Sequence, residues 1–137
     1  LVMFQLIEAN AGLPAEEGVK YRNSFATAYK KASAEIRGIY ERLADYVEYF
    51  GEGVTVSYLR NYVAFKKIKN FGAARVEDGK IILNLNLEPA KVVGQYAKAK
   101  DVTFASKYGT GYVQFTIEND DDYEVAKELL LEAYNKN

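Results

Sequence analysis

Cysteine and histidine are both absent from the 137-residue sequence. Without cysteine the chain can form neither a disulfide nor a thiolate nucleophile. Without both residues it cannot build the common zinc sites or a triad that uses imidazole as its base. No apolar run approaches the ~20 residues that a membrane-spanning helix needs. No segment has the layout of a signal peptide either, so we expect a cytoplasmic protein.

Neither sign of charge predominates, because 18 lysines and arginines stand against 19 aspartates and glutamates. The whole-chain charge therefore favours neither a nucleic-acid binder nor an acidic tail, and any site for a polyanion has to be a local patch. The length is that of one domain, which can bury roughly two thirds of its unfolded surface without disulfides or metals.

The first 23 residues are expected to precede the domain. The opening apolar run ends at Asn10-Ala11-Gly12, and Leu13-Pro14 follows, which is a typical helix stop. We expect the end of a helix and a linker over residues 1–23, and a single domain over residues 24–137. The chain opens on Leu1 rather than on methionine, so we expect it to be a fragment of a longer protein.

A long amphipathic helix is predicted over residues 24–50. Asn23 or Ser24 can cap it, and Gly51 and Gly53 can end it. Its apolar side chains recur at spacings of three and four residues, which places them on one helical face: Phe25, Tyr29, Ala32, Ile36, Ile39, Tyr40, Leu43 and Val47. We expect one side of this helix to be packed and the other to be solvated.

From Val54 the apolar period changes to two, which predicts β-strands. Three runs, over residues 54–68, 71–76 and 80–87, should form an antiparallel meander with a hairpin turn at Glu77-Asp78-Gly79-Lys80. A short helix, two strands and a final helix follow, over residues 88–99, 101–106, 111–117 and 118–137. The expected fold class is α+β: an antiparallel sheet of about five strands packed against the long N-terminal helix and the C-terminal helix.

Two glycines, Gly109 and Gly111, stand directly before the last predicted strand. A dinucleotide-binding loop needs a third glycine and a following helix, and a Walker loop ends in Gly-Lys-Ser/Thr, so neither pattern is met. A bend or bulge between paired strands explains the two glycines better. We expect this bend to hold neighbouring side chains at the rim of the sheet. The resulting candidate contact for a ligand or partner consists of Lys107, Tyr108, Gly109, Gly111, Tyr112 and Asp101.

The most basic stretch lies between residues 60 and 69, where lysines are interleaved with aromatic residues such as Phe65. Basic side chains can neutralise phosphates while aromatic rings stack on bases. The alternative candidate site is therefore a single-stranded nucleic-acid contact made by Arg60, Tyr62, Lys66, Lys67 and Lys69. A solvated, lysine-rich turn that discourages edge-to-edge strand pairing explains the same residues.

No catalytic or metal site is expected. The carboxylates between residues 118 and 124 are explained by helix capping and by the helix dipole rather than by a cation. Glu77, Asp78 and Lys80 resemble a metal-dependent cleavage triad, but the hairpin turn explains them. The tyrosines are expected at the edge of the core rather than acting as nucleophiles. We therefore predict no catalytic residues, no metal and no cofactor.

Four segments together resemble an uncharacterised bacterial and archaeal domain that is often described as a predicted transport protein: YVAFKKIKNFGAARV, KIILNLNLEP, KDVTFASKYGTGYVQFTI and DDDYEVAKELLLEAY. In that family the domain typically lies at the C-terminus of longer chains, sometimes after a restriction-endonuclease-like region. The resemblance spans roughly residues 33–134. The positions that fit the family pattern are Tyr62, Ala64, Phe65, Lys66, Asn70, Phe71, Asp101, Val102, Gly109 and Gly111.

The chain departs from the family pattern at three places. Lys100 stands where arginine is usual, the expected histidine is missing around residues 106–108, and Tyr112 replaces an acidic residue. If the family uses that histidine or that acid for chemistry, this chain lacks the means for it.

We therefore expect a non-enzymatic binding or interaction module. The resemblance implies an accessory domain of a larger defence or nucleic-acid-processing protein, with a protein partner or a covalently linked domain. A single-stranded nucleic-acid binder is the alternative, and an enzyme that uses carboxylates and lysine is a third reading. No contact with a membrane is expected, and the oligomeric state stays open.

Overall fold

The computed structural model describes residues 24–103 and 112–137. Within them, six strands form one antiparallel sheet in the order β1-β2-β3-β4-β6-β5. The strands are β1 Thr55–Tyr58, β2 Val63–Lys66, β3 Asn70–Glu77, β4 Lys80–Leu85, β5 Ala99–Asp101 and β6 Val113–Ile117. The helices are α3 Phe25–Lys31, α4 Ala34–Glu48, α5 Pro89–Val92 and α6 Asp120–Lys136. The α+β class is confirmed, with six strands where about five were predicted.

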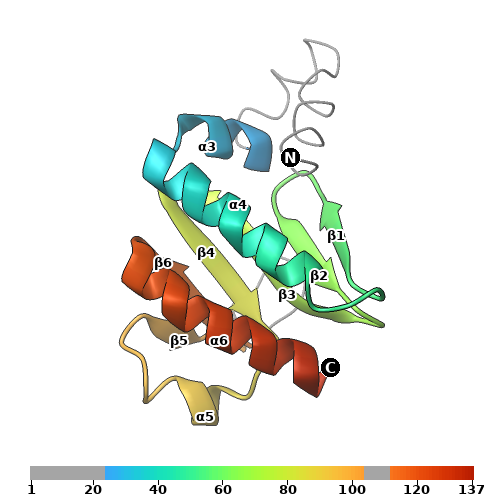
Figure 1. The fold of residues 1–137 in the computed structure, drawn as a ribbon. Coiled ribbons are helices and arrows are strands. Elements are labelled where there is room, and N and C mark those ends of the chain that lie inside the picture. The colour runs from blue at the N-terminus through green and yellow to red at the C-terminus, as the bar shows by residue number, and fades with distance from the viewer. Residues whose placement is uncertain (1–23, 104–111) are drawn as a thin grey trace.

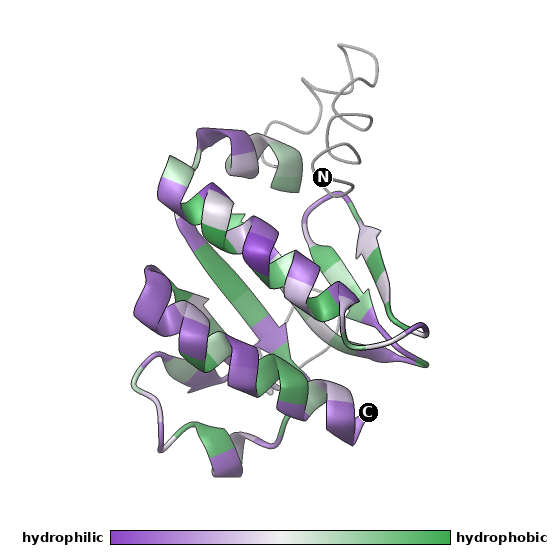
Figure 2. Cartoon of the chain, viewed as in Figure 1, coloured by the Kyte–Doolittle hydropathy of each residue, from purple (hydrophilic) through white to green (hydrophobic). Residues whose placement is uncertain are grey.

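Helices α4 and α6 lie side by side over one face of the sheet (Figure 1). The middle of β4 runs behind them and is coloured as hydrophobic in Figure 2. Its side chains Ile81, Leu83 and Leu85 are fully buried. The core of the domain therefore lies between these two helices and the central strands.

The helix predicted over residues 24–50 is in fact two helices, α3 and α4. Ala32 and Ser33 are extended, and the hydroxyl of Ser33 accepts a hydrogen bond from the amide of Ile36 at 3.1 Å, which caps α4. The side chain of Arg37 donates to the carbonyl of Ala32 at the end of α3. Because Tyr29 and Ile36 on the two sides of the break are both buried, the apolar spacing continues across it and conceals it in the sequence.

The first predicted strand, over residues 54–68, is also divided. Strands β1 and β2 are joined by a turn in which the amide of Leu59 donates to the carbonyl of Tyr62 at 2.9 Å. Glycine and proline mark most turns in a sequence, and this turn contains neither. The predicted three-stranded meander therefore has four strands, β1 to β4.

The pairing of β2 with β3 contains a β-bulge. Phe65 lies opposite Gly72, but its neighbour Lys66 lies opposite Asn70. Phe71 is thus an extra residue in β3 without a partner in β2. A bulge of this kind bends the strand and changes the side of the sheet to which the next side chain points.

Because of the bulge, two consecutive residues of β3 face the same helix. The ring of Phe71 lies 5.6 Å from the ring of Tyr134 on α6. A Cβ atom on Gly72 would lie 3.5 Å from the side chain of Leu130, also on α6. In a regular strand these neighbours would point to opposite faces. The bulge therefore brings Phe71 into the core.

The hairpin turn predicted between β3 and β4 is confirmed. Asp78 and Gly79 have φ values of 54° and 74°, and Glu77 pairs with Lys80. Two residues with positive φ between paired strands are what a type I′ turn requires, and Asp-Gly is a favoured sequence for it. The helix predicted over residues 88–99 is confirmed in part as the short α5.

Helix α6 begins at the acidic run, as predicted. The side chain of Asn119 accepts a hydrogen bond from the amide of Asp122 at 3.0 Å, and three aspartates fill the first turn, where the helix dipole favours negative charge. The predicted packed stripe is confirmed, because four of its side chains are buried: Ala126, Leu129, Leu130 and Ala133.

Leu129→Ala is expected to lower the free energy of unfolding by about 2–5 kcal/mol, because only 2 % of this side chain is exposed on the packed face of α6. Denaturant unfolding followed by circular dichroism measures the change. Leu131→Ala is the matched control, since Leu131 is 41 % exposed and its truncation should change the same free energy by less than about 0.5 kcal/mol. Equal losses for the two variants would contradict the packing of α6 through this stripe.

Candidate functional site

The turn between β2 and β3 carries three lysines around an exposed apolar residue. The amide of Lys67 donates to the carbonyl of Lys69 at 3.1 Å, which closes the turn. Ile68, at its tip, is 84 % exposed, although large apolar side chains are usually buried. Lys66 and Lys69 are exposed on its two sides. The turn therefore presents an apolar tip between positive charges.

No carboxylate in the described part of the chain pairs with these three lysines. Among residues 24–103 and 112–137, no carboxylate oxygen lies within 4.0 Å of the ammonium group of Lys66, Lys67 or Lys69. The ammonium group of Lys67 instead lies 4.4 Å from the ring centre of Tyr134, a cation–π geometry. The turn thus keeps its positive charge although the chain as a whole is close to neutral.

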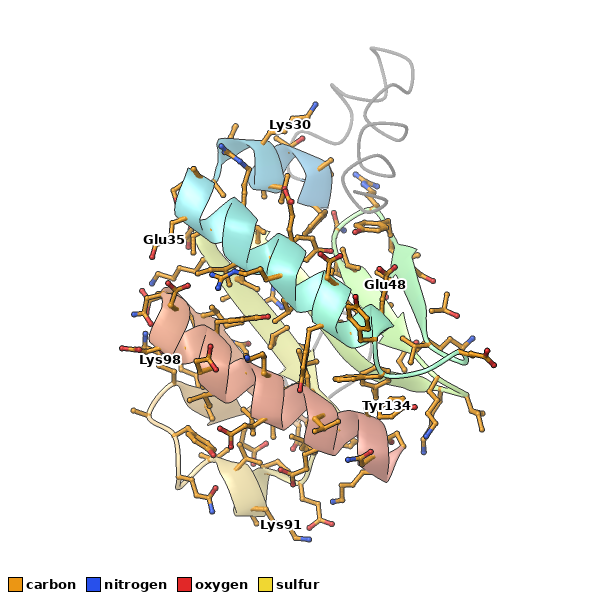
Figure 3. All side chains as sticks on the ribbon, viewed as in Figure 1. Lys30, Glu35, Glu48, Lys91, Lys98 and Tyr134 are labelled. Atoms are coloured by element: carbon orange, nitrogen blue, oxygen red, sulfur yellow. The ribbon has the colours of Figure 1, made fainter. Side chains whose placement is uncertain are left out.

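An aromatic cluster of Phe50, Phe71 and Tyr134 packs next to this turn. The ring of Tyr134 lies 4.8 Å from that of Phe50 and 5.6 Å from that of Phe71, and the last two lie 6.2 Å apart. Tyr134 stands near the C-terminal end of α6 (Figure 3). Tyr49, directly before Phe50, is 87 % exposed at the C-cap of α4. The cluster therefore joins α4, the turn and α6 at one end of the domain.

We define this end of the domain as the hairpin end, with the residues Tyr49, Lys66, Lys67, Ile68, Lys69 and Tyr134. The end of α4, the turn and the end of α6 meet there (Figure 1). The sequence marked the three lysines but not Tyr49, Ile68 or Tyr134. Tyr134 follows Leu130 at a spacing of four, which is typical of a core position, and an isolated isoleucine in a turn gives no pattern at all.

The structure does not bring together the whole basic and aromatic set predicted around residues 60–69. Arg60 and Tyr62 lie in the β1–β2 turn, whereas Lys66 and the other lysines lie beyond the opposite end of β2. The four residues of β2 extend over about 13 Å. Phe65, between them, is fully buried, so its ring cannot stack on a base.

The rim predicted around Gly109 and Gly111 is described only in part. Lys107, Tyr108, Gly109 and Gly111 lie outside the described residues. Tyr112 is exposed, and its carbonyl accepts a hydrogen bond from the amide of Val102 at 2.8 Å. This bond places Tyr112 beside Val102, the residue that follows Asp101.

Asp101 already has partners within its own loop. Its carboxylate accepts hydrogen bonds from the amide and the hydroxyl of Thr103, at 3.0 and 2.6 Å. These bonds stabilise the charged form and hold the pKa of Asp101 below its ordinary value. The carboxylate therefore serves the local turn and stays ionised at neutral pH.

Three carboxylates of the acidic run at residues 118–124 form ion pairs with basic side chains from other parts of the chain. Lys98, which lies beside the N-terminal end of α6 (Figure 3), donates to Asp122 at 2.5 Å and pairs with Glu118 at 2.9 Å. Arg42 on α4 pairs with Asp120 at 2.5 Å. The run thus attaches α4 and the residue directly before β5 to the start of α6.

The described part of the chain offers neither a metal site nor a membrane span. Within it, no three side chains of the metal-binding types come together in a way that could hold an ion. None of the helices in that part is both long enough and apolar enough to cross a bilayer.

The buried tyrosines are held in their neutral form. The hydroxyl of Tyr29 donates to Glu41 at 2.5 Å, and that of Tyr40 donates to Tyr58 at 3.3 Å. Burial raises the pKa of Tyr29 and Tyr40, and it raises the pKa of Tyr58 to about 12. A tyrosine that resists ionisation is a poor nucleophile. Tyr29 and Tyr40 lie within the core rather than at its edge, where the tyrosines were predicted, and Tyr58 is partly buried against it.

One family model matches most of the chain, over residues 26–137, and it is described as a domain of unknown function (DUF5655). This match agrees with the resemblance to an uncharacterised domain. No curated protein and no solved structure matches the chain.

Lys98→Met is expected to reduce the acid sensitivity of the fold. The hydrogen bond from Lys98, followed by attraction to Lys80, holds the pKa of Glu118 below its ordinary value. A lowered carboxyl pKa adds stability above the ordinary pKa and loses it as the pH falls through the folded value. The unfolding free energy of the unchanged protein should therefore fall more steeply below about pH 5 than that of the variant.

Denaturant unfolding at a series of pH values measures these slopes. Lys100→Met is the matched control, because Lys100 is an exposed lysine two residues further along the chain, in β5, and has no ion pair among the described residues. Its slope should equal that of the unchanged protein. An unaltered slope for Lys98→Met would contradict the role of this ion pair.

Proposed function

The chain belongs to the DUF5655 family, whose function is unknown, and we propose that it is a non-enzymatic binding module that contacts its partner through the hairpin end. The observation that carries this proposal is the exposed Ile68 between three lysines that have no carboxylate partner in the part of the chain that the structure describes. Exposed apolar side chains that are rimmed by charge are typical of contact surfaces.

The hairpin end combines an apolar anchor with a charged rim. Burying an isoleucine against a partner contributes about 1.5–3 kcal/mol, which is the scale of a binding hot spot. Lys66 and Lys69 on its two sides would attract an acidic surface and set its orientation. Tyr49, which is also exposed, adds a rigid ring to the same end. The partner that fits is a protein surface with an apolar pocket and an acidic rim.

The family resemblance supplies the setting that we propose. The module serves as an accessory domain of a larger bacterial or archaeal defence or nucleic-acid-processing protein in the cytoplasm. Its partner is then a linked domain, such as a restriction-endonuclease-like region, or a separate protein. The description as a transport protein is not part of this proposal.

A second candidate function is binding of single-stranded nucleic acid. It is favoured by three lysines that have no carboxylate partner among the described residues, together with the exposed ring of Tyr49, since lysines neutralise phosphates and rings stack on bases. The ring of Tyr134 is less available for stacking, because Lys67 lies over it.

Ile68→Asp is expected to weaken retention of the protein partner by about tenfold or more, because the apolar contact is lost and an acidic group faces an acidic rim. The immobilised domain is exposed to an extract of its source cells, and quantitative mass spectrometry compares the retained proteins. Leu131→Asp is the matched control, since it places the same charge at another exposed apolar residue. Identical sets of proteins on the variant and on the unchanged domain would contradict the proposal.

Exchanging Lys66, Lys67 and Lys69 for glutamine tests the nucleic-acid candidate. Binding to an oligothymidylate should weaken, and the slope of log affinity against log salt should flatten by roughly one unit for each lost phosphate contact. Fluorescence anisotropy measures both quantities. An unchanged slope, or no binding of the unchanged domain at low salt, would eliminate this candidate.

A further inference from the structure

A cavity of about 660 Å³ lies beyond the other end of β2, away from the hairpin end. Its polar side chains come from α3, from the β1–β2 turn, from the end of β3 and from the turn that follows β3. They are Thr27, Lys31, Asn61, Arg75, Glu77 and Asp78. The volume falls within the range of roughly 300–1,000 Å³ that is typical of small-molecule sites.

Two opposite charges face this cavity from different elements without being paired. Lys31 belongs to the last turn of α3, and Asp78 to the tight turn between β3 and β4. Among the described residues, neither has an oppositely charged group within 4.0 Å, and they do not pair with each other. A ligand with a single charge would satisfy one of them and be repelled by the other.

An ion pair also belongs to the lining of this cavity. Nε of Arg75 donates to Glu77 at 3.1 Å, and a terminal nitrogen of Arg75 donates to Asn84 at 3.3 Å. The guanidinium is therefore fixed in orientation by two partners. Because Arg75 and Glu77 already pair with each other, Lys31 and Asp78 are the lining charges that have no ion-pair partner among the described residues.

We propose that this cavity binds a short peptide or a similar small zwitterion. The carboxylate of the ligand pairs with Lys31, and its ammonium group pairs with Asp78. Thr27 and Asn61 can hydrogen bond to the amide groups between these two ends. A short peptide is the chemical class that carries both charges with amides between them. The site is separate from the hairpin end, so the two proposals stand or fall independently.

Triglycine is the probe that tests this proposal on the full chain. Saturable shifts of the amide resonances of Lys31, Asn61 and Gly79 are expected in NMR spectra of the nitrogen-labelled protein. N-acetyl-triglycine lacks the ammonium group and triglycine amide lacks the carboxylate. Each of these two probes should bind at least about tenfold more weakly than triglycine, because one charge-assisted contact is lost.

Lys31→Gln and Asp78→Asn should each weaken triglycine binding by a similar factor. Both side chains are exposed, and asparagine tolerates the positive φ of residue 78, so the fold is retained. Lys30→Gln is the matched control, because Lys30 is an exposed lysine of α3 (Figure 3) that does not line the cavity, and its change should leave binding unaltered. Equal binding of all three probes, or no saturable shift with triglycine, would overturn the proposal.

Discussion

The extra residue in β3 turns Phe71 and Gly72 toward the same helix, and the contact between α6 and the sheet depends on this geometry. Phe71 fills the space beside Phe50 and Tyr134, where each aromatic pair contributes about 0.5–1.5 kcal/mol beyond its buried area. A Cβ atom on Gly72 would be in ordinary contact, 3.5 Å from the side chain of Leu130 and 3.4 Å from a backbone oxygen of β4. A large ring and a missing side chain thus sit next to each other in the strand.

The same contact determines how the hairpin end is presented. The turn of residues 67–69 follows directly on β2 and is attached through Lys67 to the ring of Tyr134. Tyr134 in turn packs against Phe50 at the end of α4. The lysines and Ile68 are therefore displayed on a support that three elements hold in place. A preorganised surface loses less conformational entropy when it binds.

Much of the fold could be predicted from the sequence, because apolar spacing and turn residues mark most elements. The α6 stripe, the Asp78-Gly79 turn and the acidic helix start follow from such local rules. The break at Ser33 could not be predicted, because the apolar period continues across it. The same holds for the bulge at Phe71, whose position depends on pairing with a distant strand.

The sequence predicted only those residues of the candidate site that lie close together in one short stretch. Lys66, Lys67 and Lys69 are adjacent in the sequence and remain together in the fold. Arg60 and Tyr62 are nearly as close in the sequence, but β2 separates them from the lysines. Tyr134 joins the site from 65 or more residues away, and only the packing of α6 reveals it.

NMR mapping of the domain in complex with its co-purified partner tests the central claim most directly. The account predicts that amide shifts concentrate at Tyr49 and residues 66–69, and shifts confined to the rim at Asp101 and Tyr112 would contradict it.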